Sequence, residues 1–317
     1  MKIREARTHG VLVIAAVAVS GLAAGCTAQS GSSAVTQQTG HAPSSTASPS
    51  SDSGTPASTA GSSAAATANG ASAALAGNRC VTSSHAGNCG PYKYSDITVS
   101  NGYSTYVSND IWNPIPGASQ TMTATDPGHW SAVAHMPARN TAVLSYPNTN
   151  QIFTTATNSP APLSGFGKIV ATFRERMPKN AQTSAEFGFD VWAGQSTATD
   201  GADEMMIWTD TENRGTCGGA TVLRTATFGG ANGVPVQTWT LCRNGAASPK
   251  SEYIWYLAGA QESAGTVDVL SMEKWMVTKG YYPAGTGINQ IDFGAEICST
   301  GGAPETFSLR AYTLASS

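Results

Sequence analysis

Residues 203–208 read Asp203-Glu204-Met205-Met206-Ile207-Trp208, a short apolar run between turn-forming residues, and this pattern predicts a β-strand. Alternate side chains of a strand point to opposite faces. Met205 and Ile207 therefore share one face, while Glu204, Met206 and Trp208 share the other. A carboxylate inside an apolar strand costs free energy unless it has a partner or a function. A solvated glutamate on an edge strand is the alternative interpretation of this segment taken alone.

Two further segments repeat the pattern of one apolar face and one acidic face. Residues 186–192 alternate apolar side chains with Asp190, and residues 291–297 alternate apolar side chains with acids that include Glu296. If the three strands share a sheet, Asp190, Glu204 and Glu296 can meet on its open face. Two carboxyl groups across a cleft suit glycoside hydrolysis, in which one protonates the leaving oxygen and the other attacks the sugar or activates water.

These segments also resemble a known family, the family 12 glycoside hydrolases. The Glu-x-Met-x-Trp motif of residues 204–208 is similar to the strand that carries the nucleophile in that family. The resemblance extends from about residue 101 to residue 314. It also includes Phe-Asp-Val-Trp at 189–192, Gly-Ala-Glu-Ile at 294–297 and Asn-Asp-Ile-Trp-Asn at 109–113.

The resemblance implies a retaining endo-β-1,4-glucanase, a cellulase-like enzyme that needs no metal or organic cofactor. Glu204 would be the nucleophile, Glu296 the acid and base, and Asp190 the residue that holds Glu204 in place. The substrate-binding residues implied are Asn109, Trp112, Met206 and Trp208.

The loop after Trp208 departs from the family pattern. The family has a Pro-Ile-Gly turn, whereas residues 214–219 of this chain read Arg-Gly-Thr-Cys-Gly-Gly. This departure supports a rival hypothesis, a catalytically inactive carbohydrate-binding surface lipoprotein on the same fold. Both glutamates are present, which favours the enzyme.

The N-terminal residues predict export. Lys2, Arg4 and Arg7 precede an apolar run at 11–25, and small residues lead to Cys26, as in a bacterial lipoprotein signal. We expect lipidation of Cys26 and a site at the outer face of the cell envelope, with a secreted protein as the alternative. Residues 26–77 are rich in Ser, Ala, Thr, Gly and Pro, a composition that predicts a disordered tether.

Residues 78–317 predict one all-β domain. The resemblance implies that this domain is a two-sheet β-jelly roll with a substrate cleft on its concave sheet. Short β-rich runs alternate with turn residues throughout. The apolar spacing at 267–279 predicts one short helix, and the Gly-Gly-Ala-Asn-Gly sequence at 229–233 predicts a hairpin turn. The other strands that we expect are 141–146, 168–173, 221–228, 234–241 and 253–257.

The cysteines predict disulfides, because exported proteins meet oxidising conditions. We expect Cys80 to pair with Cys89 and Cys217 with Cys242, which leaves Cys298 over. The histidines and cysteines show no metal-ligand spacing. The net charge of −3 does not indicate nucleic-acid binding and suits a neutral polysaccharide partner. We expect a monomer that contacts the membrane only through its lipid.

Overall fold

The computed structural model describes residues 80–83, 105–111, 113, 115–153, 159–195, 203–245, 252–259 and 261–317. All of them fall inside the predicted domain, residues 78–317. The predicted signal segment, the lipidation site at Cys26 and the tether at 26–77 lie outside the described residues, as does Trp112.

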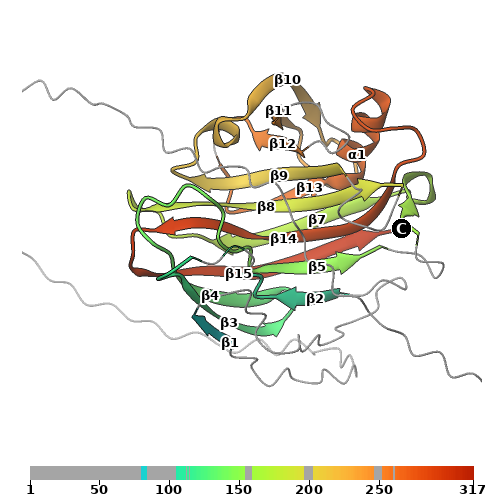
Figure 1. The fold of residues 1–317 in the computed structure, drawn as a ribbon. Coiled ribbons are helices and arrows are strands. Elements are labelled where there is room, and N and C mark those ends of the chain that lie inside the picture. Colours follow the sequence, from blue (N-terminus) through green and yellow to red (C-terminus); the bar gives the residue numbers. More distant parts are fainter. Residues whose placement is uncertain are drawn as a thin grey trace, which may run out of the picture. The chain divides into compact units, whose positions relative to one another are not determined.

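The described residues form two β-sheets that pack into a sandwich, as predicted (Figure 1). One sheet has six strands in the order β1-β3-β4-β15-β7-β13. Their bounds are β1 Cys80–Ser83, β3 Ser119–Asp126, β4 His129–His135, β15 Pro304–Ser316, β7 Ile169–Arg176 and β13 Ala264–Asp268.

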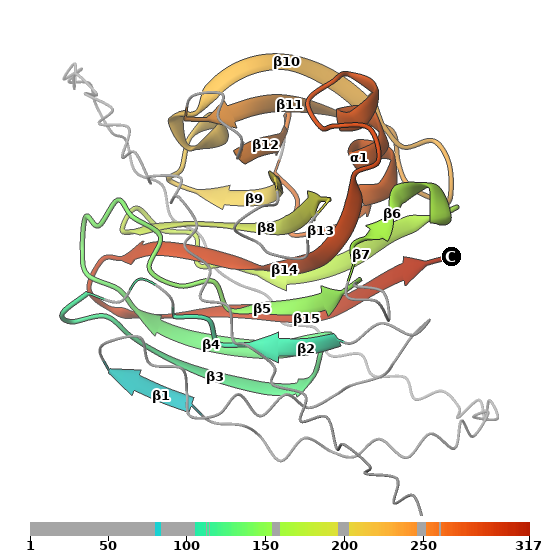
Figure 2. The ribbon, with the colours of Figure 1, turned by 45° about the vertical axis from the view of Figure 1, so that its right-hand side comes forward.

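The second sheet has nine strands, eight of them in the order β10-β11-β12-β9-β8-β14-β5-β2, with β6 paired to β14. Figure 2 shows β10, β11 and β12 together at one end of this sheet. The bounds are β10 Thr221–Phe228, β11 Gln237–Asn244, β12 Glu252–Leu257, β9 Asp203–Glu212, β8 Thr183–Gly194, β14 Gly287–Thr300, β5 Asn148–Ile152, β2 Thr105–Ser108 and β6 Ala161–Pro162.

The three acid-bearing segments do share a sheet, because β8 pairs with β9 on one side and with β14 on the other. Their two faces bury different side chains. The face opposite the acids packs into the main core between the sheets. There the centre of the Phe293 ring lies 4.4 Å from that of Phe189 and 5.3 Å from that of Tyr312. Met206 and Trp208 belong to a separate cluster on the opposite face, with Ile254 of β12. The period of two therefore predicted the faces correctly.

The helix and the hairpin are also confirmed. Helix α1, Val269–Thr278, begins after Asp268, whose carboxylate accepts a hydrogen bond from the backbone N–H of Ser271 at 3.0 Å. It is the α-helix of the described residues, and none of their helices is long and apolar enough to cross a bilayer. The hairpin joins β10 to β11, and its residues Asn232 and Gly233 both have positive φ.

One predicted strand, at 141–146, does not form. Ser145 makes a single bridge to Ile297, and the backbone N–H of Leu144 donates to the carbonyl of Ile297 at 3.0 Å. Strand β5, which follows this segment, takes the place beside β14. Val143 and Leu144 are buried, and these apolar residues gave the segment a strand-like pattern. The segment nevertheless makes only the single bridge and does not pair along a neighbouring strand.

A second carboxyl cluster joins the two sheets away from the acid-bearing face. Glu175 of β7 is buried beside Asp210 of β9, and Asp210 accepts a hydrogen bond from Lys179 at 2.6 Å. Burial, followed by the hydrogen bond to Asp210, raises the pKa of Glu175 to about 9. Glu175 is therefore protonated in the folded protein at neutral pH.

This proton makes stability depend on pH. Between pH 5 and pH 8 the unfolded chain ionises Glu175 and the folded chain does not. The free energy of unfolding should therefore fall by about 1.4 kcal/mol for each unit by which the pH rises, from this group alone. Glu175→Gln keeps a donor toward Asp210 and removes the titration. We expect the variant to be more stable than wild type at pH 8 and similar at pH 4.5.

Urea unfolding at both pH values tests this expectation. Glu212→Gln is the control, because Glu212 also lies near Lys179, at 3.9 Å, but its side chain is partly exposed. An equal stability change in both variants would contradict the assignment of the proton to Glu175.

Candidate active site

The acid-bearing face of the nine-stranded sheet is built on β8, β9 and β14, with Asp190 on the central strand. In the register of the sheet Asp190 lies opposite Met206 on β9 and opposite Asp292 on β14. Glu204 lies opposite Trp192, and Glu296 lies opposite a further acid, Glu186. Four carboxyl groups of three adjacent strands therefore point to one face, with Asp292 as a fifth.

The three predicted catalytic acids are close enough to affect one another electrostatically. Burial and then the charges of Glu204 and Glu296 raise the pKa of Asp190 well above its ordinary value. Burial and then the charges of Glu252 and Glu296 raise the pKa of Glu204. Like charges in a desolvated site resist ionising together, so the cluster retains protons at neutral pH.

The neighbouring strands add two more acids to this cluster. Glu252 of β12 lies opposite Glu204, and burial followed by the charge of Glu296 raises its pKa to about 8. Asp110 follows β2 with a φ of 28°, and burial followed by the charge of Glu296 raises its pKa to about 7. Such surroundings raise the pKa of a carboxyl group, so that it keeps its proton up to about neutral pH and can then donate it.

Met206 and Trp208 occupy the predicted face but are covered. Both side chains are fully buried. A Cβ on Gly188 would lie 3.1 Å from Cδ1 of Trp208, and a Cβ on Gly218 would lie 2.9 Å from its Cη2. These two glycines leave the space that the indole fills, and the guanidinium of Arg214 lies over its ring at 4.5 Å. In this structure no face of the Trp208 ring is open to a sugar.

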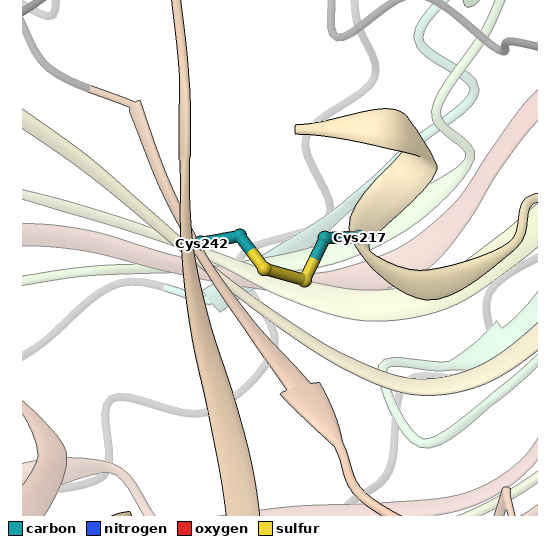
Figure 3. Close-up of a disulfide and its surroundings, with 2 residues drawn as sticks. All are labelled: Cys217 and Cys242. Atoms are coloured by element: carbon teal, nitrogen blue, oxygen red, sulfur yellow. A yellow bond between two sulfur atoms is a disulfide. The ribbon is translucent and has the colours of Figure 1, made fainter. Parts of the chain in front are cut away.

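The loop that departs from the family pattern supplies that cover. Cys217 forms the predicted disulfide with Cys242 of β11, and the bond fastens the loop beside the sheet (Figure 3). Cys298 is itself disulfide-bonded, so the prediction that it is left over is wrong. Its Sγ accepts a hydrogen bond from Arg214 Nη1 at 3.1 Å. The predicted pairing of Cys80 with Cys89 involves side chains outside the described part.

Asn109 is held at the end of β2, near the cluster. Its backbone carbonyl and its Oδ1 both accept hydrogen bonds from Nε2 of Gln120, at 2.7 Å and 2.9 Å. Gln120 in turn accepts a hydrogen bond from Ser145 at 2.8 Å. This network fixes the start of the Asn-Asp-Ile segment at the end of β2.

Sequence reasoning missed four members of the cluster: Asp110, Glu186, Arg214 and Glu252. Glu186 could have been found, because it has the same parity as Asp190 and lies on the same strand. Arg214 gave no local signal, since its partners are on β8 and β14. Among the described residues no group of three or more His, Cys, Asp or Glu side chains is arranged to hold a metal ion.

Comparisons with known proteins give matches to solved structures. No family model and no curated protein sequence matches the chain. The xyloglucanase domain of NopAA, a type three effector from Sinorhizobium fredii, in complex with cellobiose, is 20% identical with a TM-score of 0.52, covering 71% of this chain and 96% of that one. A family 12 xyloglucanase from Bacillus licheniformis is 16% identical with a TM-score of 0.54, covering 67% and 93%.

Endoglucanase 3 of family 12 from Trichoderma harzianum is 18% identical with a TM-score of 0.52, covering 76% of this chain and 98% of that one. At these low identities the structural matches show the fold alone, and any catalytic role must be argued from the residues of this chain. This chain has the β-sandwich fold of the family 12 glycoside hydrolases.

Proposed function

We propose that the chain is a retaining endo-glycosidase that hydrolyses a β-1,4-linked glucan, such as a cellulose-like chain, a mixed-linkage glucan or xyloglucan. Glu204 attacks the anomeric carbon and forms a covalent glycosyl ester. Glu296 protonates the leaving oxygen and then removes a proton from the attacking water. Asp190, on the strand between them, holds Glu204 in place.

The observation that carries this proposal is the convergence of Glu204, Asp190 and Glu296 on one face of three adjacent strands. Each of these strands also contributes to the buried core on its other face, so the acids are held on rigid elements. The named structures of the same fold include xyloglucanases, and one of them is in complex with cellobiose. A neutral glucan also suits a site in which acids predominate.

A second candidate function is carbohydrate binding without catalysis. The observation that favours it is the loop after Trp208, which departs from the family pattern and places Arg214 beside the carboxyl groups of Glu186 and Glu296. A binding protein would retain the fold and the polar face without turning over the polymer.

Reducing-sugar release separates the two functions. We expect the purified protein to release reducing ends from barley β-glucan, carboxymethylcellulose or xyloglucan, with product sizes that show internal cleavage. Retention on insoluble cellulose without any sugar release across this panel would support the binding protein and refute the hydrolase.

A further inference from the structure

One cross-strand row of residues crosses the nine-stranded sheet between Glu204 and Glu296. Each member is the direct partner of the next in the register of the sheet, so all members point to the acid-bearing face. Glu204 precedes the member on β9, and Glu296 follows the member on β14. Because β9 and β14 are both antiparallel to β8, they run in the same direction, and the two glutamates lie on opposite sides of the row. The members from β14 to β10 are Gly294, Gly188, Trp208, Tyr256, Thr240 and Thr225.

The row is uncharged, whereas acids stand on both sides of it. Asp190 and Asp292 are partners on the side of Glu204, and Glu186 is the partner of Glu296 on the other side. A glycosidic bond held between Glu204 and Glu296 therefore lies over the row. A neutral polymer that continues from this bond along the row crosses the strands and meets no further charge on the row itself.

The row becomes accessible toward the β10 edge of the sheet. Trp208 is fully buried, with Arg214 over its ring. Tyr256 and Thr240, the next two members, are partly exposed, and Thr225 is exposed. The exposed fraction therefore rises from β9 through β12 and β11 to β10.

The opposite end of the row is closed. Beyond Gly294 the register continues to Asn148 of β5 and Ser108 of β2, and both side chains are buried. Of the part of the row that the structure describes, the half on β12, β11 and β10 is thus the half that a polymer can reach.

The side chains of the accessible half suit a sugar. Tyr256 packs against the buried cluster of Met206 and Trp208, which holds its ring on the sheet. An aromatic ring can cover the apolar C–H face of a sugar, and its phenol can form a hydrogen bond. The hydroxyl groups of Thr240 and Thr225 can both donate and accept hydrogen bonds, as the hydroxyl groups of a sugar do.

We propose that Tyr256, Thr240 and Thr225 bind the part of the glucan chain that extends from the acids across β12, β11 and β10. The inference rests on the proposed function and adds three substrate-binding residues to it. Tyr256 packs against a sugar ring, and the two threonines form hydrogen bonds with sugar hydroxyl groups. None of the three takes part in making or breaking a bond, so they bind the ground state and the transition state alike.

The Michaelis parameters for barley β-glucan test this proposal, because loss of such uniform binding raises KM and leaves kcat unchanged. Tyr256→Ala should raise KM about tenfold, and Tyr256→Phe, which keeps the ring, should stay near wild type. Thr225→Val/Thr240→Val removes two hydroxyl groups and should raise KM about fivefold. Valine keeps the β-branched shape that suits a strand, so the double variant tests the proposal even if Tyr256→Ala loses its fold.

The matched control is Thr172→Val/Thr266→Val. These two threonines are also cross-strand partners, with their Oγ1 atoms 3.2 Å apart, but they lie on β7 and β13 of the other sheet. The control should keep the wild-type KM. A rise in KM for the control equal to that for Thr225→Val/Thr240→Val would contradict a role for the acid-bearing face.

A native gel that contains hydroxyethylcellulose measures binding without catalysis. We expect the gel to retard the wild-type protein and the control, and to retard Tyr256→Ala and Thr225→Val/Thr240→Val less. Wild-type KM and wild-type retardation in both of these variants would overturn the binding residues and leave the hydrolase intact. A wild-type protein that cleaves no glucan, but whose retardation depends on Tyr256 and the two threonines, would refute the hydrolase and keep the binding residues.

Discussion

Glu204→Ala should lower the rate of β-glucan hydrolysis by several orders of magnitude, and Glu296→Ala should do the same. Each variant removes a group that forms or breaks a bond in the transition state, and loss of such a group lowers kcat. Glu212→Ala is the matched control. Glu212 lies on the same strand as Glu204 at its far end, and it should leave the rate near wild type.

The two losses differ in kind, and azide distinguishes them. In Glu204→Ala an azide ion can fill the vacated space and attack an activated substrate once, which gives a glycosyl azide of inverted configuration. In Glu296→Ala the covalent intermediate still forms when the leaving group needs no proton. Azide then displaces Glu204 from the opposite side, which gives a product of retained configuration.

The configuration of the two azide products, read by NMR, therefore reports both roles. A retained product from Glu204→Ala would show that the roles are reversed. Near wild-type activity in both variants would place the catalytic pair elsewhere. The outcome also tests the distance between the two carboxyl groups. In a retaining enzyme they lie about 5–5.5 Å apart, too close for an intervening water.

The fold could be predicted because strand periodicity depends on local side chains. Phe187 and Phe189 are two residues apart and Asp190 has the other parity, and the structure places them on the two faces that a period of two predicts. The same period of two also predicted the faces of β9 and β14, so that all three acid-bearing segments were assigned correctly. The prediction of a strand at 141–146 was wrong because a buried apolar run can lie beside a sheet without pairing along it.

The environment of the predicted acids could not be read from the sequence. Arg214 lies 28 residues after Glu186 in the chain, and only the folded loop brings it to 2.6 Å from that carboxyl. The burial of Trp208 depends on the same loop and on two glycines that leave room for its ring. Long-range contacts of this kind decide protonation states, whereas strand patterns decide only which side chains share a face.

The disulfide between Cys217 and Cys242 is expected to have the second large effect. The loop that it closes spans 25 residues in sequence, so its removal should cost about 3 kcal/mol of stability by the chain-entropy estimate. Cys217→Ser/Cys242→Ser tests this cost by urea unfolding under oxidising conditions. The variant is preferable to a reducing agent, because Cys298 is disulfide-bonded as well and would also be reduced.

The same variant should expose Trp208 and slow the proposed reaction. Four residues of the loop have positive φ: Asn213, Gly215, Cys217 and Gly218. Regular strand pairing cannot hold a backbone of this kind, so the disulfide is expected to hold it. Without the disulfide, Arg214 should leave the ring of Trp208 and the carboxyl of Glu186. We expect acrylamide to quench tryptophan fluorescence more strongly in the variant, and its rate of β-glucan hydrolysis to fall. Unchanged quenching and an unchanged rate, together with the expected loss of stability, would show that the loop holds Arg214 in place without its disulfide.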